Sequence, residues 1–264
     1  MCALPFRHIQ MAFYDNSKED RVLIVAEIDR IIAAAVADGT IGNLLPYFSD
    51  EDTYIRKTAY LSIGKLYKND PGLLPQLLKA LQQLFTSAEP KVRQTVVNAA
   101  GEIGKYNFDP VVSYFDTGLF DEHHSVRNAV IGSMKKIGEK NPVPILEWSR
   151  KYLHHEDKEI RREICHGIEL RGRTHPQDIL PLLKELQHDK TRRVRWTLVH
   201  VIGQIAYKKG CLETVMADIL QWENQALVQD AIAEIIDVHH RYRNFSYYTQ
   251  DEARAYISGL DTTT

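Results

Sequence analysis

The sequence has few cysteines, and the three that are present are widely spaced. Cys2, Cys165 and Cys211 form no C-x-x-C pair and no Cys/His spacing typical of a zinc site. An odd number of scattered thiols speaks against a disulfide framework, and the spacing speaks against a structural zinc ion. Together with the lack of a secretory signal, this pattern favours a reducing, cytoplasmic location.

The sequence also lacks a strong net charge, a long apolar run and the common catalytic motifs. A net charge of −2 over 264 residues offers no general attraction to nucleic acid or anionic lipid. The most apolar stretch, residues 22–37, contains Glu27, Asp29 and Arg30, so we expect no membrane association. No P-loop, Gly-rich dinucleotide turn or Ser/Cys nucleophile motif is present. We therefore expect no cofactor and no metal, and a binding protein rather than an enzyme.

What the sequence does contain is an internal repeat marked by an apolar residue followed by arginine. Successive arginines are 37, 34, 34 and 34 residues apart, and Gln229 continues the register 34 residues further on. The marked pairs are Ile55-Arg56, Val92-Arg93, Val126-Arg127, Ile160-Arg161, Val194-Arg195 and, in the last copy, Val228-Gln229. A fixed period in this range indicates a solenoid in which stacked units bury one another.

Each repeat reads as a helical hairpin. After the arginine, apolar residues recur at offsets +3, +4, +7 and +10, which is the periodicity of a helix with one buried stripe. In the second copy these are Val96, Val97, Ala100 and Ile103, and in the fifth they are Leu198, Val199, Ile202 and Ile205. Another helical pattern precedes each of these, and four such patterns open at a proline: Pro71, Pro110, Pro142 and Pro176.

At this point the chain resembles the HEAT repeats, in particular the short variety shared with phycobilisome lyase-like proteins. The stretch Glu89–Gly104 follows that pattern of an acidic turn, Val-Arg, small residues and Gly-x-Ile-Gly. The resemblance covers roughly residues 40–240. It implies an all-α, right-handed α-α superhelix (a HEAT/ARM-type solenoid) of about six helical hairpins. Residues 1–264 would then be one domain, with an N-terminal capping helix over 17–38, and with 241–264 as a C-terminal cap and a loose tail.

Two rows of side chains are expected on the second helices. If offsets +3, +4, +7 and +10 are buried, then +1 and +5 face away from the core, one turn apart. In HEAT-like solenoids the second helices line the concave side, so these rows would line a groove. In repeats 4 to 6 the rows contain Arg162, His166, Trp196, His200, Asp230 and Glu234. An exposed tryptophan among such groups predicts a protein or peptide partner in the groove of repeats 4–6; local packing is the alternative.

Basic residues gather in one segment and leave nucleic acid open as a partner. Residues 150–209 contain 14 Lys and Arg against 8 Asp and Glu, and Arg192 and Arg193 lie in the densest cluster. The Arg-rich repeats around Trp196 are similar to those of the HEAT-like alkylpurine DNA glycosylases. This resemblance implies DNA binding and, if the protein is an enzyme, action on alkylated bases. The chain departs from that family at His200, because a Trp/Asp pair on one helix is missing.

A second enzyme family with this architecture, the deoxyhypusine hydroxylase type, presents repeated His-Glu pairs to a di-iron centre. In this chain the only His-Glu pair is His155-Glu156, which falls in a turn. That interpretation therefore fails, and no catalytic residue is predicted.

Overall fold

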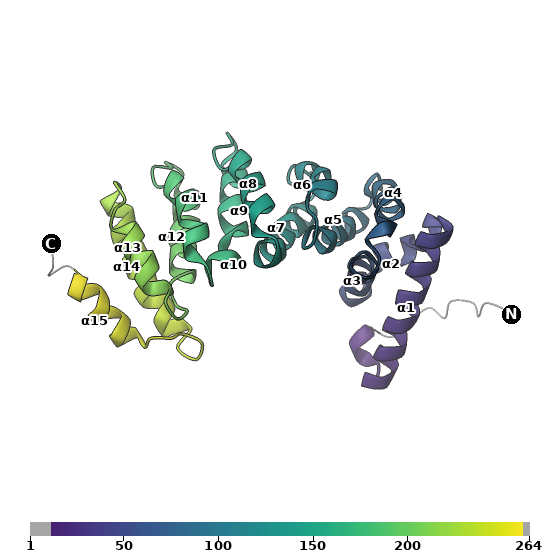
Figure 1. Ribbon diagram of the computed structural model, residues 1–264, viewed down its shortest axis with the longest axis horizontal. Helices are drawn as coiled ribbons and strands as arrows, with labels where there is room; N and C mark the ends of the chain where they lie inside the picture. Colours follow the sequence, from purple (N-terminus) through teal and green to yellow (C-terminus); the bar gives the residue numbers. More distant parts are fainter. Residues whose placement is uncertain (1–11, 261–264) are drawn as a thin grey trace. The chain divides into compact units, whose positions relative to one another are not determined.

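The computed structural model describes residues 12–260, and every regular element in that range is helical (Figure 1). The all-α, HEAT-like class predicted from the repeat is therefore confirmed. None of the described helices is long and apolar enough to cross a membrane. Two expectations fall outside the described residues: those for Cys2 and for residues 261–264 of the tail.

The chain divides into two compact units, residues 1–133 and 134–264, and the boundary lies inside α7 (His124–Lys140). The prediction of one continuous solenoid domain stays a prediction, and the two units are described separately. The helices of unit 1 that precede α7 are η1 (Phe13–Asp15), α1 (Lys18–Asp38), η2 (Ile41–Asn43), α2 (Leu45–Ser49), α3 (Thr53–Asn69), η3 (Pro71–Leu73), α4 (Leu74–Phe85), α5 (Pro90–Gly104), η4 (Asp109–Val111) and α6 (Val112–Gly118).

Unit 2 continues the alternation of first and second helices that the repeat predicts. The helices that follow α7 are α8 (Pro142–Tyr152), α9 (Lys158–Gly167), α10 (Glu169–Gly172), η5 (Pro176–Asp178), α11 (Leu180–Glu185), α12 (Arg192–Gln204), α13 (Cys211–Ile219), α14 (Gln225–Arg241) and α15 (Gln250–Leu260). One feature was not predicted: the second helix of the fourth repeat is interrupted at Ile168, which separates α9 from α10.

The second helices of each unit pack side by side. In unit 1, α3 packs against both α5 and α1. In unit 2, α12 lies between α9 and α14, and α15 packs against α14. These lateral contacts give each helix the apolar neighbour that a single hairpin lacks.

Side-chain caps start several helices where the sequence places them. Ser17 accepts a hydrogen bond from the backbone N–H of Asp20 at the start of α1, and Asp52 and Asp157 cap α3 and α9 in the same manner. Pro90 is the first residue of α5, where its missing N–H costs nothing. The acceptors in the inter-helix turns thus set the register of the second helices.

The predicted apolar stripes form the core. Val96, Val97, Ala100 and Ile103 are all fully buried in unit 1. In unit 2 the stripe consists of Leu198, Val201 and Ile202 of α12 and of Ile205, the residue that follows this helix, and all four are fully buried. The expectation for Val199 was wrong, because this residue is only partly buried and Val201 takes its place in the core.

The repeated arginine holds the turn between the two helices of a hairpin. In four repeats its Nη1 donates to the backbone carbonyls of the residues six and five positions earlier. The pairs are Arg56 with Asp50 and Glu51, Arg93 with Ser87 and Ala88, Arg127 with Asp121 and Glu122, and Arg161 with His155 and Glu156. One guanidinium thereby satisfies two carbonyls that the turn leaves without a helical partner.

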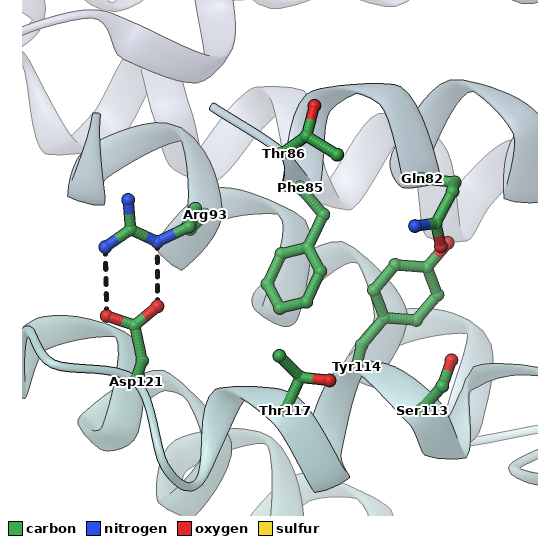
Figure 2. Close-up of a pocket in the computed structure, with 8 residues that line it drawn as sticks. All are labelled: Gln82, Phe85, Thr86, Arg93, Ser113, Tyr114, Thr117 and Asp121. Carbon is green, nitrogen blue, oxygen red and sulfur yellow. Dashed lines mark hydrogen bonds and ion pairs between the residues drawn. The ribbon is translucent and has the colours of Figure 1, made fainter. Parts of the chain in front are cut away.

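Two of these arginines also reach the turn of the next repeat. Arg93 donates from Nε and Nη2 to the two carboxylate oxygens of Asp121, at 2.7 and 3.0 Å (Figure 2). Arg161 makes the same pair of bonds with Asp189, at 2.6 and 3.4 Å. The carboxylate side chains are only 8% exposed, so these bidentate pairs are worth more than ordinary surface ion pairs.

Glycine in the second helices allows them to approach one another closely. A Cβ added at Gly101 of α5 would lie 2.4 Å from Ser133 Oγ and 2.6 Å from Ser133 Cβ. Such distances are too short for non-bonded atoms, so the close approach of the two backbones requires glycine at this position.

We expect Gly101→Ala to lower the free energy of unfolding by about 1–3 kcal/mol, because overpacking outweighs the gain in helix propensity. Gly132→Ala is the matched control, since Gly132 is also within a helix but has nothing within 4 Å of an added Cβ. That substitution should stabilise the protein by about 0.5–1 kcal/mol. Denaturant unfolding monitored by circular dichroism measures both changes, and a stabilising Gly101→Ala would refute the close approach.

Asp121 should contribute to stability in a pH-dependent way. Its burial raises its pKa, but the hydrogen bonds from Arg93 and from the N–H of His123 outweigh burial, so the pKa lies below its usual value. A carboxyl group with a lowered folded-state pKa stabilises the fold above its ordinary pKa of about 3.9, and this contribution is lost as the pH falls through the folded-state pKa. Asp121→Asn should therefore cost about 1–2 kcal/mol at neutral pH and progressively less in acid.

The neighbouring Glu122→Gln is the control, because Glu122 pairs with the same arginine but its side chain is 89% exposed. Its effect should stay within about 0.5 kcal/mol. Equal losses for the two substitutions, in urea unfolding at neutral pH and at about pH 3, would contradict the assignment.

Candidate functional site

The candidate site lies on the second helices of unit 2. Because α9, α12 and α14 pack side by side, their +1 and +5 positions form two neighbouring rows. We call this surface the second-helix face; it contains Arg162, His166, Trp196, His200, Asp230 and Glu234. Trp196 and Asp230 are exposed, and the other four are partly buried. Their role as a binding site stays a prediction.

Trp196 is the most exposed of the three tryptophans. Its exposed fraction is 65%, whereas Trp148 and Trp222 are 2% and 1% exposed, as expected for core residues. The guanidinium of Arg192, one turn earlier on α12, lies 5.0 Å from the centroid of the indole ring. This cation–π contact leaves an apolar surface beside a positive charge. The predicted exposure of Trp196 is therefore confirmed.

Arg162 and Arg193 converge on a carboxylate that the sequence analysis did not single out. Glu159 accepts from Arg162 Nε at 2.9 Å and pairs with Arg193 Nη1 at 2.8 Å. Glu159 stands three residues before Arg162 on α9, and this spacing could have predicted the pair. The positive charge of the two arginines is thus partly neutralised.

The acidic residues of the face are paired as well. Asp230 accepts from Arg195 Nη2 at 2.7 Å, so Arg195 contacts the neighbouring helix α14 instead of an acid in a turn. Glu234 forms an ion pair with Arg241 and lies 3.5 Å from His200 Nδ1. The second-helix face therefore carries both signs of charge in close alternation.

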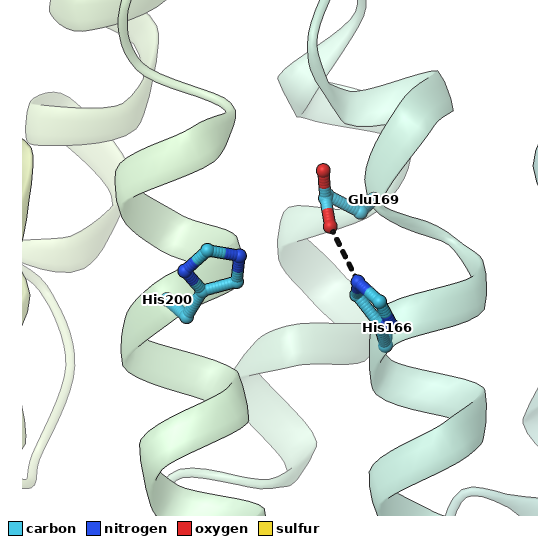
Figure 3. Close-up of side chains that lie close together, drawn as sticks. All are labelled: His166, Glu169 and His200. Atoms are coloured by element: carbon cyan, nitrogen blue, oxygen red, sulfur yellow. Dashed lines mark ion pairs between the residues drawn. The ribbon is translucent and has the colours of Figure 1, made fainter. Parts of the chain in front are cut away.

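His166 and His200 meet beside a buried carboxylate that the sequence analysis missed (Figure 3). His166 Nε2 lies 3.1 Å from Oε2 of Glu169 on α10, and one ligand atom from each of the three residues falls within 4.8 Å of the others. Glu169 stands at offset +8, where Gly64, Gly101 and Gly203 stand in other repeats. That departure from the pattern was the signal available in the sequence.

Glu169 is held by positive groups on several sides. Arg173 donates to its Oε1, and the ammonium of Lys135 lies 3.5 Å from its Oε2 and 3.0 Å from His166 Nε2. Burial raises the pKa of Glu169, but the hydrogen bond from His166 and the charges of Lys135 and Arg173 outweigh it and lower the pKa to about 2. The carboxylate is therefore ionised at neutral pH.

The arginines of residues 150–209, with the exception of Arg192, are paired with carboxylates within unit 2. Beyond the pairs already described, Arg171 bonds to Asp178 at 2.7 Å, and Arg150 lies near Glu185. Arg192 has no ion pair among the described residues. Most arginines of the segment thus stand beside an acid, whereas its lysines form no ion pair within the described part of the chain.

Unit 1 contains a separate recess that the sequence analysis did not predict (Figure 2). Its volume is about 330 Å³, and it is lined by Phe85, Tyr114 and the Arg93–Asp121 pair, among others. Tyr114 donates its hydroxyl to the carbonyl of Leu78 at 3.2 Å, and burial raises its pKa to about 12. The polar groups around this recess serve the packing of α4, α5 and α6.

The chain is similar to known proteins in part of its sequence and in its fold. Residues 21–164 match the family model of Cnd1, the non-SMC mitotic condensation complex subunit 1, which is more than half of the chain. No curated protein matches the chain in sequence.

Among solved structures, AlkD2 from Streptococcus mutans superposes with a TM-score of 0.51 at 16% identity, covering 77% of this chain and 97% of that chain. The protein crescerin, described as using a TOG domain array to regulate microtubules in the primary cilium, gives a TM-score of 0.48 at 16% identity, covering 74% and 88%. At these identities the AlkD2 similarity shows the fold alone. The HEAT-like fold is thereby confirmed, and so is the resemblance to AlkD-type solenoids at the level of the fold.

Trp196→Ala should change the free energy of unfolding by less than about 1 kcal/mol, because it removes an exposed ring and one exposed cation–π contact. Trp148→Ala should cost about 3–5 kcal/mol, because it leaves a cavity in the core. In the native protein, acrylamide should quench mainly Trp196, and that quenching should vanish in Trp196→Ala. A large loss of stability in Trp196→Ala would mean that the indole belongs to the core.

Proposed function

Since the chain belongs to the Cnd1 family, the non-SMC mitotic condensation complex subunit 1, we propose that it is a HEAT-like binding scaffold that holds a protein partner. The family is named for a subunit of a complex, and a subunit acts through its contacts with other proteins. We place the contact on the second-helix face of unit 2. The matched residues, 21–164, end inside α9, near its last residue, and of the face they include only Arg162, so the proposal for this face rests on its own chemistry.

The exposed Trp196 is the observation that carries the proposal. A tryptophan that is 65% exposed keeps a large apolar surface in water, which is unfavourable unless a partner covers it. Tryptophan and arginine are enriched among the residues that dominate protein–protein binding energy. Trp196 and Arg192 stand together at the exposed start of α12, so a partner could cover both at once.

The charges around Trp196 favour a partner of mixed character. Glu159 neutralises Arg162 and Arg193, and Asp230 pairs with Arg195, so neither sign dominates the surface. Arg192 offers its remaining hydrogen-bond donors to a carboxylate. A partner segment that combines an apolar or aromatic side chain with an acidic one fits this arrangement best.

The basic excess of residues 150–209 keeps DNA binding as the alternative. Duplex DNA is bound through many phosphate contacts, which need arginines and lysines that are free to leave their protein partners. Here Arg161, Arg162, Arg171, Arg173, Arg193 and Arg195 are each paired with a carboxylate. This pairing supports a protein partner over a duplex.

The proposal is tested by capturing partners with the immobilised full chain and then measuring the affinity of the retained partner. Trp196→Ala should weaken that affinity by about 2 kcal/mol, or roughly 30-fold, as expected for an interface anchor. Phe245→Ala is the matched control, because Phe245 is 68% exposed but follows the end of α14. A partner that binds wild type and Trp196→Ala equally well would refute the assignment of the face.

A titration of labelled duplex DNA decides the alternative. If the proposal holds, binding stays weak at low salt, and replacing Arg192 and Arg193 by alanine leaves it unchanged. Tight binding that weakens steeply with salt, with a slope flattened by the double substitution, would replace the protein partner by DNA.

A further inference from the structure

The structure brings two histidines and one carboxylate together in unit 2. We propose that His166, Glu169 and His200 form a site for a divalent transition-metal ion. Their ligand atoms lie within 4.8 Å of one another. Two imidazole nitrogens and one carboxylate oxygen are a donor set that suits Zn²⁺ and Fe²⁺ and is poorly matched to Mg²⁺ or Ca²⁺. This inference does not depend on the proposed partner.

The backbone places the three donors on facing helices. His166 and Glu169 are three residues apart, across the junction of α9 and α10, and both side chains turn to the same side (Figure 3). His200 reaches them from α12, which packs against α9. Ligand atoms around a tetrahedral zinc ion lie about 3.3 Å apart for metal–ligand bonds of about 2.0 Å. His166 Nε2 and Glu169 Oε2 already lie 3.1 Å apart. The side chain of His200 is partly exposed, so rotation about its side-chain bonds would bring its ring nitrogen to the same distance from these two atoms.

A further layer of residues orients these donors. Glu234 Oε1 lies 3.5 Å from His200 Nδ1, which leaves the other ring nitrogen of His200 for a metal. Arg173 donates to Oε1 of Glu169, at 2.5 Å from Nη2, and its Nη2 also bonds to Gln204. The Oε2 atom of Glu169 therefore faces the histidines. Carboxylate-oriented histidines and hydrogen-bonded ligating carboxylates are typical of metal sites.

The ammonium group of Lys135 lies beside the proposed ligands, which shows that this position attracts a cation. It lies 3.0 Å from His166 Nε2 and 3.5 Å from Glu169 Oε2, at the end of a flexible side chain that is 24% exposed. A metal ion and this ammonium would repel each other, so the metal binds only when Lys135 swings toward solvent. Lys135 therefore competes with the metal and sets how tightly it binds.

The three ligands leave a coordination position for a fourth. Both histidine side chains are partly exposed, 37% for His166 and 42% for His200, so the open position faces the surface. Water or an oxygen or nitrogen donor of a bound molecule would complete the coordination. The metal would thereby add a strong, directional contact to the +5 row of the second-helix face.

The test is a titration of the metal-free full chain with Zn²⁺ by calorimetry, repeated with Fe²⁺ under anaerobic conditions and with Mg²⁺. We expect one Zn²⁺ or Fe²⁺ per chain and no Mg²⁺. His166→Ala and His200→Ala should each weaken binding at least about tenfold, because each removes one of three ligands. Lys135→Met should tighten binding about tenfold or more, because it removes the competing charge.

His154→Ala is the matched control, because His154 Nε2 also lies beside a glutamate, 2.8 Å from Glu185 Oε2, but belongs to no group of three potential ligands among the described residues. It should leave the titration unchanged, and circular dichroism checks that every variant is folded. Equal binding by wild type and by a His166→Ala/His200→Ala double variant would overturn the site. The absence of binding to both wild type and Lys135→Met would overturn it as well.

Discussion

The architecture depends on one hydrogen-bonding arrangement, which the arginine near the start of the second helix makes in four of the repeats. Its guanidinium bonds to two carbonyls of the turn just before it, which otherwise would need water or another donor. The angle between the two helices of a hairpin is thereby fixed by a side chain within the same repeat. In two repeats the same guanidinium also binds an aspartate of the next turn, so one group sets both the hairpin and its neighbour.

This constraint leaves the chemistry of the second-helix face free to vary while the fold stays the same. In α9, α12 and α14 the core is formed by the buried apolar stripes, and the +1 and +5 positions lie outside these stripes. Arg162, Trp196 and Asp230 differ completely in chemistry at the +1 position. Such a row can be specialised for a partner without loss of stability, which is the usual division of labour in repeat proteins.

The fold was predictable from the sequence because it rests on local, periodic signals. The period of 34 residues, the caps such as Ser17 and Asp157, and the exposure of Trp196 all follow from helix geometry applied within one repeat. The charge pairs were harder to predict from the sequence. Arg193–Glu159 and Arg195–Asp230 each join two different repeats, and they form only because the long arginine side chain extends to the neighbouring helix. Glu169 was missed because it stands at a position read as a spacer, and the break at Ile168 has no signal that we recognise in the sequence.

The glycine position at offset +8 has a consequence for how such proteins diversify. In Gly64, Gly101 and Gly203 this position is a gap that admits a neighbouring helix, whereas in the third and fourth repeats it holds Lys135 and Glu169. The same register thus holds a glycine spacer in some copies and a charged side chain in others. Substitution of this one position in two adjacent repeats, by design or in evolution, can therefore create a polar cluster between helices. The rest of each repeat keeps its usual sequence pattern.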